Sequence, residues 1–137
     1  MEELSMKDLK KLFALALFLA CAAVTSFAVP LSQLRIVAAD GTFLGTFESE
    51  YSTNSVYNEY GSYGSPYSTN SIMNKYSSYG SDYSSCSPFN EYASEAPWIV
   101  DRYGNSYGRL SVNRYASGVT RISYEIALDL KALRDSY

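Results

Sequence analysis

The longest apolar run of the chain covers residues 12–24 and follows a short segment that carries three lysines between positions 7 and 11. Two small residues, Ser26 and Ala28, then stand at the −3 and −1 positions of a cut after Ala28. A basic segment, an apolar run and a small-residue cleavage site in this order are typical of a secretory signal peptide. We therefore expect residues 1–28 to be removed and the protein to be exported, whether it is secreted, periplasmic or at the cell surface.

Two other outcomes for this segment stay open. If the apolar run is extended through Val29, its length comes close to the ~20 residues that a helix needs to span a bilayer. In that case the segment would stay uncleaved and anchor the protein in the membrane. Phe18-Leu19-Ala20-Cys21 loosely resembles a lipoprotein box, with Phe18 where that box usually has leucine. Lipid on Cys21 would make the protein a membrane-anchored lipoprotein of the envelope. We therefore expect the protein to contact a membrane only through an uncleaved or lipidated N-terminus.

Two segments with strand-like patterns, residues 35–47 and 98–115, bracket the middle of the chain. Each holds a β-rich run, a glycine five residues after an isoleucine, and a second run. Asp40-Gly41 is a strong signal for a short hairpin turn, and Tyr103-Gly104-Asn105 is a fair one. Because a lone hairpin is marginal in water, we expect the two hairpins to pair into one antiparallel sheet.

The stretch after residue 119 fits two periods. A helical spacing joins Val119, Ile122, Ile126, Leu130 and Leu133, and a strand-like alternation joins Ile122, Tyr124, Ile126, Leu128 and Leu130. The Ala, Leu, Lys, Glu and Arg content after residue 124 favours an amphipathic helix whose apolar stripe covers the sheet. The expected fold is therefore a small α+β domain over residues 29–137, with its C-terminal helix within 119–137.

Between the hairpins, residues 51–95 contain three copies of a 16-residue repeat. The first two copies read YSTNSVYNEYGSYGSP and YSTNSIMNKYSSYGSD, and a shorter third copy begins at Tyr83. Self-similarity at a fixed period is the signature of a repeat architecture. We interpret the block as a compact, loop-rich layer in which tyrosine rings supply missing aliphatic core, although disordered polar and aromatic sequence is the alternative.

Within each copy, a serine that follows the first tyrosine is a good helix N-cap. The pattern therefore predicts one helical turn per copy, over residues 53–58, 69–74 and 85–90. An asparagine would end each turn, because asparagine tolerates left-handed backbone geometry. Six side chains are expected to face inward: Val56, Ile72, Pro88, Tyr57, Met73 and Phe89.

The segment from Asn58 to Ser68 reads Asn-Glu-Tyr-Gly-Ser-Tyr-Gly-Ser-Pro-Tyr-Ser. It resembles the tandem pattern Asn-x-Tyr-Gly-x-Tyr-Gly-Ser-x-Tyr-Ser of uncharacterised exported bacterial proteins. The second copy departs from this pattern with Ser77 in place of Gly61, and the third copy loses the glycines. The resemblance covers roughly residues 43–115. It implies export and a repeat architecture, and it implies no activity.

Composition excludes several functions. The chain has no histidine, which removes the usual general base and the commonest metal ligand. A net charge of −3 does not suit nucleic-acid binding, which normally needs a basic patch. Residues 48–95 hold six acids against one base, and we interpret this as solvated surface rather than a cation site. We expect no catalytic residues, no metal and no cofactor, and therefore a protein that is not an enzyme.

Tyrosine, serine, glycine and asparagine together are typical of adaptable binding surfaces, because tyrosine offers rigid contact area and the others offer hydrogen bonds. The repeats therefore predict binding through Tyr60, Tyr63, Tyr76, Tyr79, Asn58 and Asn74, with a cell-wall glycan or an envelope protein as partner. Alternatively, the rings pack the fold. A self-associating structural protein is a further alternative, through tyrosine stacking or through Cys86. This cysteine is the single one left after removal of the leader, and we expect it either to form an intermolecular bridge or to be a free thiol.

Overall fold

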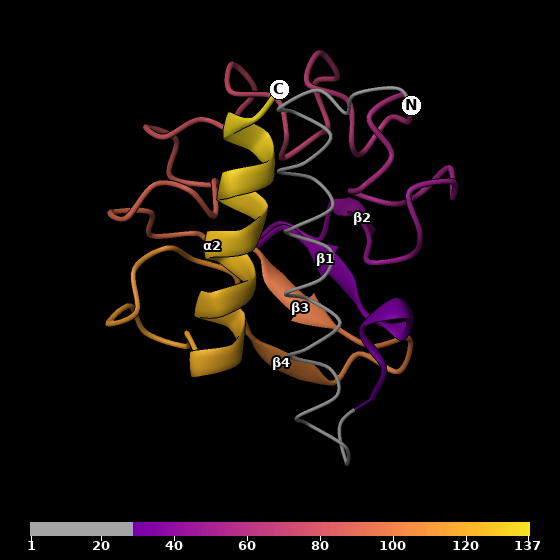
Figure 1. The fold of residues 1–137 in the computed structure, drawn as a ribbon. Coiled ribbons are helices and arrows are strands. Elements are labelled where there is room, and N and C mark those ends of the chain that lie inside the picture. The colour runs from indigo at the N-terminus through magenta and orange to yellow at the C-terminus, as the bar shows by residue number, and fades with distance from the viewer. Residues whose placement is uncertain (1–28) are drawn as a thin grey trace, which may run out of the picture.

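The computed structural model describes residues 29–137, so the expected signal peptide, including Cys21, lies outside the described residues. A 3-10 turn, Leu31–Gln33, leads into strands β1 (Arg35–Val37) and β2 (Phe43–Thr46). The repeat block follows, then β3 (Trp98–Val100), β4 (Ser106–Arg109) and helix α2 (Arg121–Asp135). Figure 1 shows α2 standing beside the sheet, with the repeat loops gathered around its C-terminal half.

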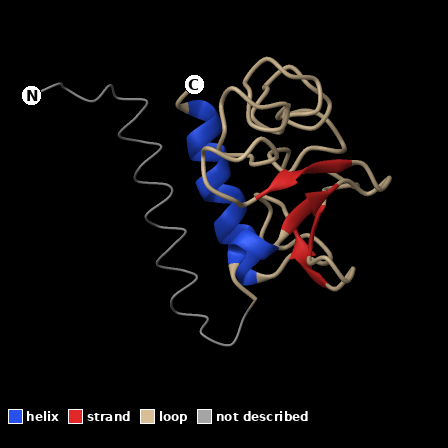
Figure 2. Ribbon diagram, turned by 90° about the vertical axis from the view of Figure 1, so that its right-hand side faces the viewer, coloured by secondary structure: helices blue, strands red, loops and turns tan. Residues whose placement is uncertain are grey.

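The four strands form one antiparallel sheet in the order β2-β1-β3-β4. Its centre is the pairing of β1 with β3, where Ile36 lies opposite Ile99 and both side chains are buried. Each hairpin turns through a glycine with positive φ, Gly41 at 91° and Gly104 at 85°, a region that favours glycine. Together with the single C-terminal helix, this sheet confirms the expected small α+β fold (Figure 2).

Thr120 is the N-cap of helix α2 and forms a capping box with Ser123. Thr120 Oγ1 accepts the N–H of Ser123 at 3.0 Å, and Ser123 Oγ accepts the N–H of Thr120 at 2.8 Å. This cap satisfies two backbone donors that the first helical turn leaves without partners. The helical period therefore prevails over the alternating one, and Leu128, which only alternation placed on the apolar face, is exposed. Ile122 is also exposed, so the expected apolar stripe is wrong at this position.

The repeat block is a chain of tight turns, each closed by a hydrogen bond from an N–H to the carbonyl oxygen three residues earlier. In the first copy these bonds measure 3.0–3.3 Å and join Ser52 to Ser49, Ser55 to Ser52, Asn58 to Ser55, Gly61 to Asn58, and Gly64 to Gly61. The second copy repeats the pattern through Ser68, Ser71, Asn74, Ser77 and Gly80. Because only every third residue closes a bond, the chain turns repeatedly without winding into a helix.

The helical turns expected over residues 53–58, 69–74 and 85–90 are therefore wrong, since no residue in these ranges is helical. Ser55 Oγ accepts the N–H of Tyr57 at 3.0 Å, and the equivalent serines of the other copies do the same. Such local bonds compete with helix formation. The serines expected as N-caps cap no helix. The hydroxyls of Ser68 and Ser84 accept the N–H groups of Asn70 and Cys86 within the turns. The carbonyl oxygens of all three serines accept an asparagine Nδ2: Ser52 from Asn58, Ser68 from Asn74, and Ser84 from Asn90.

The side chains expected to face inward are buried, which confirms that part of the prediction. They join the sheet and the helix in one core, whose members from the strands and α2 include Leu44, Ile126, Leu130 and Leu133. The repeats also cover an edge of the sheet, because Thr46 of β2 bridges to Ser55 in parallel. At the other edge, the N–H of Arg109 in β4 donates to the carbonyl of Gly118 at 2.8 Å.

Candidate functional site

The most conspicuous surface feature of the described chain is a set of exposed tyrosines. Eight of the 14 tyrosines are between 78% and 95% exposed: Tyr51, Tyr60, Tyr67, Tyr76, Tyr83, Tyr92, Tyr103 and Tyr115. Six of these occupy two positions that recur in every copy, one at the start of the copy and one after the asparagine. The repeat therefore presents two tyrosine rings to solvent per copy.

The turns use only the backbone of these tyrosines. The N–H of Tyr60 donates to Asn58 Oδ1 at 3.0 Å, and the N–H of Tyr76 donates to Asn74 Oδ1 at 2.9 Å. Tyr67 likewise donates its N–H to Ser65 Oγ at 3.1 Å. Any residue except proline has such an N–H, so the turn does not require an aromatic ring at these positions.

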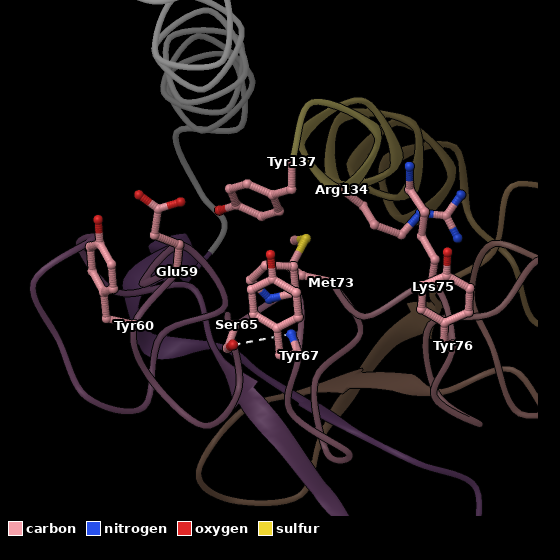
Figure 3. A pocket seen from close by; sticks show the side chains of 10 residues that line it. Glu59, Tyr60, Ser65, Tyr67, Met73, Lys75, Tyr76, Arg134 and Tyr137 are labelled. Atoms are coloured by element: carbon pink, nitrogen blue, oxygen red, sulfur yellow. Dashed lines mark hydrogen bonds between the residues drawn. The ribbon is translucent and has the colours of Figure 1, made fainter.

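Three of the exposed rings surround one pocket of about 490 Å³ (Figure 3). The middle parts of the first and second copies form its two sides, with Tyr60 and Glu59 on one and Tyr76 and Lys75 on the other. The remaining lining comes from the junction of the two copies, from the second copy, and from α2 and the residues after it: Ser65, Pro66, Tyr67, Met73, Arg134 and Tyr137. The site is thus a gap between neighbouring repeats, bounded by the helix.

The pocket has charged groups of both signs. Arg134 is buried and forms ion pairs within the protein. Its Nη2 lies 2.7 Å from Asp82 Oδ1 and 2.9 Å from Asp135 Oδ1. Burial, together with the negative charges of Glu59 and Glu50, raises the pKa of the Tyr137 phenol well above its ordinary value. Tyr137 is therefore neutral at physiological pH and contributes an uncharged ring to the lining of the pocket.

The structure brings two of the predicted binding residues, Tyr60 and Tyr76, to this pocket. Tyr63 and Tyr79 lie elsewhere: the ring of Tyr63 contacts Phe43 edge-on at 4.9 Å between centroids, and Tyr79 packs against the core. The amides of Asn58 and Asn74 are occupied with the turns.

Sequence reasoning missed the other lining residues. Tyr67 could have been found, because it repeats the exposed position of Tyr51 and Tyr83. Arg134 and Tyr137 carry no such signal, since only the fold places the end of α2 beside the repeats.

Cys86, predicted as a free or bridging thiol, lies in the third copy and is half-buried. It is a free cysteine, and its Sγ lies 3.9 Å from Glu95 Oε2 and 3.9 Å from Ser85 Oγ. Cys86 is not among the pocket residues.

Within residues 29–137, no group of three or more potential metal-ligating acids and cysteines lies together. The same part of the chain contains no helix of the length and apolarity needed to cross a membrane. A comparison with protein-family models, curated proteins and solved structures finds no match for the chain. The candidate function therefore rests on the pocket and on the repeats that form it.

Proposed function

We propose that the protein is a non-enzymatic, exported module of the cell envelope that binds glycan in the pocket between its first and second repeats. The observation that carries the proposal is the placement of three exposed rings, Tyr60, Tyr67 and Tyr76, around one pocket. The turns do not require aromatic rings there, so their presence is better explained by contact with a ligand. Exposed apolar area of this kind commonly marks an interaction site.

The chemistry of the pocket suits a sugar. A pyranose presents C–H groups on its faces, which pack on aromatic rings, and hydroxyl groups around its edge, which need hydrogen-bond partners. The tyrosine rings supply the flat apolar surfaces and their hydroxyls supply donors and acceptors. Glu59 adds a carboxylate that accepts from sugar hydroxyls.

A binding role is favoured over hydrolysis of the glycan. Hydrolysis of a glycosidic bond ordinarily needs two carboxyl groups on either side of that bond. The residues that line the pocket include a single carboxylate, Glu59. The chain also has no histidine to serve as an alternative general base.

Replacing Tyr60 or Tyr76 by alanine is expected to weaken glycan binding about tenfold, because each ring contributes roughly 1–1.5 kcal/mol of stacking. Isothermal titration calorimetry with an oligomer of N-acetylglucosamine and an oligomer of galacturonic acid measures the effect. Tyr92→Ala is the matched control, since Tyr92 occupies the same repeat position and is 85% exposed but lies outside the pocket. All three variants should keep the parent's free energy of unfolding within about 0.5 kcal/mol. Equal losses of affinity in all three variants would count against the pocket.

Self-association is a second candidate function, favoured by the exposed tyrosines that lie outside the pocket: Tyr51, Tyr83, Tyr92, Tyr103 and Tyr115. Both edges of the sheet are hydrogen-bonded to other parts of the chain, so association would run through these rings or Cys86 rather than through strand pairing. Analytical ultracentrifugation over a wide concentration range tests it. Association through rings predicts a mass that rises with concentration and falls back in a Tyr83→Ser, Tyr92→Ser double variant. A constant monomer mass without reducing agent excludes this role.

A further inference from the structure

The residue before the second exposed tyrosine of each copy changes its charge from copy to copy. It is Glu59 in the first copy, Lys75 in the second and Glu91 in the third. Since all three copies form the same turn, the turn does not require a particular charge at this position. The lysine of the second copy stands at the rim of the pocket, where the neighbouring copies would place a carboxylate.

The two cations of the pocket differ in what they already bind. Arg134 is held by Asp82 and Asp135 and donates to the carbonyl of Gly80, so its charge is compensated within the protein. Lys75 is exposed, and among residues 29–137 it has no carboxylate within ion-pair distance. Figure 3 shows Lys75 beside Tyr76 on one side of the pocket and Glu59 beside Tyr60 on the other. Lys75 is therefore the pocket cation that has no ion pair with the described residues, and it lies on the side opposite Glu59.

We infer that the ligand is a glycan that carries a carboxylate group, and that Lys75 binds this carboxylate while the tyrosine rings hold the sugar faces. This inference rests on the proposed glycan-binding function and specifies its ligand. A neutral glycan uses the rings and Glu59 but leaves Lys75 without a partner.

The test measures binding of three probes to the full chain by isothermal titration calorimetry: an oligomer of galacturonic acid, an oligomer of N-acetylglucosamine, and a polyglutamate peptide of similar charge. The variant is Lys75→Gln. The control is Arg121→Gln, which removes the same charge at the first residue of α2, about 20 Å along the helix axis from Arg134. Neither residue is buried, so both variants should fold.

We expect the parent to bind the galacturonic acid oligomer more tightly than the neutral oligomer. Lys75→Gln should weaken binding of the acidic oligomer about five- to tenfold, while leaving the neutral oligomer unaffected, and Arg121→Gln should change neither. The acidic affinity should also fall with added salt. Equal binding of both oligomers, or equal effects of the two variants, overturns the carboxylate inference while the glycan function stands. Failure of both oligomers to bind overturns the glycan function itself, and tighter binding of polyglutamate assigns the site to an acidic peptide instead.

Discussion

Replacing Arg134 by methionine is expected to lower the free energy of unfolding by about 3 kcal/mol. The side chain is 1% exposed and joins the end of α2 to two repeats. Its guanidinium donates to the carbonyl of Gly80, pairs with Asp82 at 2.7 Å, and lies 4.7 Å from the ring centre of Phe89. Methionine retains apolar contact in the core but leaves the buried carbonyl without its donor, which is costly.

Arg121→Met is the matched control for this prediction. Arg121 is on the same helix and also pairs with an acid, Glu125, at 3.3 Å, but its side chain is 91% exposed. Exposed pairs of this kind contribute little, so the control should lose less than about 0.5 kcal/mol. Urea unfolding followed by circular dichroism measures both variants. Similar losses at the two positions would mean that Arg134 does not fasten the helix to the repeats.

The second large effect is expected at Gly64. A β-carbon built on Gly64 would lie 2.1 Å from the carbonyl oxygen of Asn58 and 2.8 Å from that of Val56. Both carbonyl oxygens are backbone atoms in the chain of turns, so the steric clash with a β-carbon can be removed only if the whole turn shifts. Gly64→Ala should therefore lower the free energy of unfolding by about 3 kcal/mol, at the upper end of the usual cost of overpacking. Gly80, the equivalent residue of the second copy, is equally confined by the carbonyl of Asn74.

Gly61→Ala provides the comparison, because the second copy carries Ser77 at the equivalent position and accommodates a β-carbon there. The nearest atom to a β-carbon on Gly61 is the carbonyl oxygen of Thr53 at 3.0 Å. We expect a loss below about 1 kcal/mol, partly offset by the reduced entropy of the unfolded chain. Thermal and urea unfolding of the two variants decide the matter, and a Gly64→Ala protein as stable as the parent would show that the turns are not tightly packed.

The fold class could be predicted because its signals are local. Asp40-Gly41 and Tyr103-Gly104 mark the hairpin turns, and the two isoleucines that precede them, Ile36 and Ile99, lie opposite each other at the centre of the sheet. The helix was predicted within a stretch that also fits a strand. Thr120 and Ser123 favour the helix by forming the capping box at its N-terminus.

The path of the chain within the repeats could not be derived from the 16-residue period alone. The first copy closes a turn at every third residue, at positions held by serine, asparagine and glycine. A serine that follows a tyrosine, such as Ser52, also suits a helix N-cap. The sequence does not show that the next serine, Ser55, accepts the N–H two residues ahead and so competes with a helix. The period of three is visible in the sequence only once the turns are known.

Only part of the candidate site could be predicted from the sequence, because the path of the chain within the repeats was not known. Tyrosines at every repeat position look equivalent in sequence, yet Tyr60 and Tyr76 lie at the pocket while Tyr63 packs against Phe43. The distinction comes from the turns, which direct some rings outward and others toward the sheet. Arg134 and Tyr137 join the site through long-range packing of α2, which leaves no local pattern.

Glycan binding in the pocket is tested most directly by nuclear magnetic resonance of the full chain with ¹³C-labelled tyrosine rings, titrated with the galacturonic acid and N-acetylglucosamine oligomers. The glycan proposal predicts saturable shifts of the ring signals of Tyr60, Tyr67 and Tyr76. The rings outside the pocket, such as those of Tyr83, Tyr92 and Tyr115, should keep their positions. Equal shifts of all exposed rings, or no shifts with either oligomer, would contradict the assignment of this pocket as a glycan-binding site.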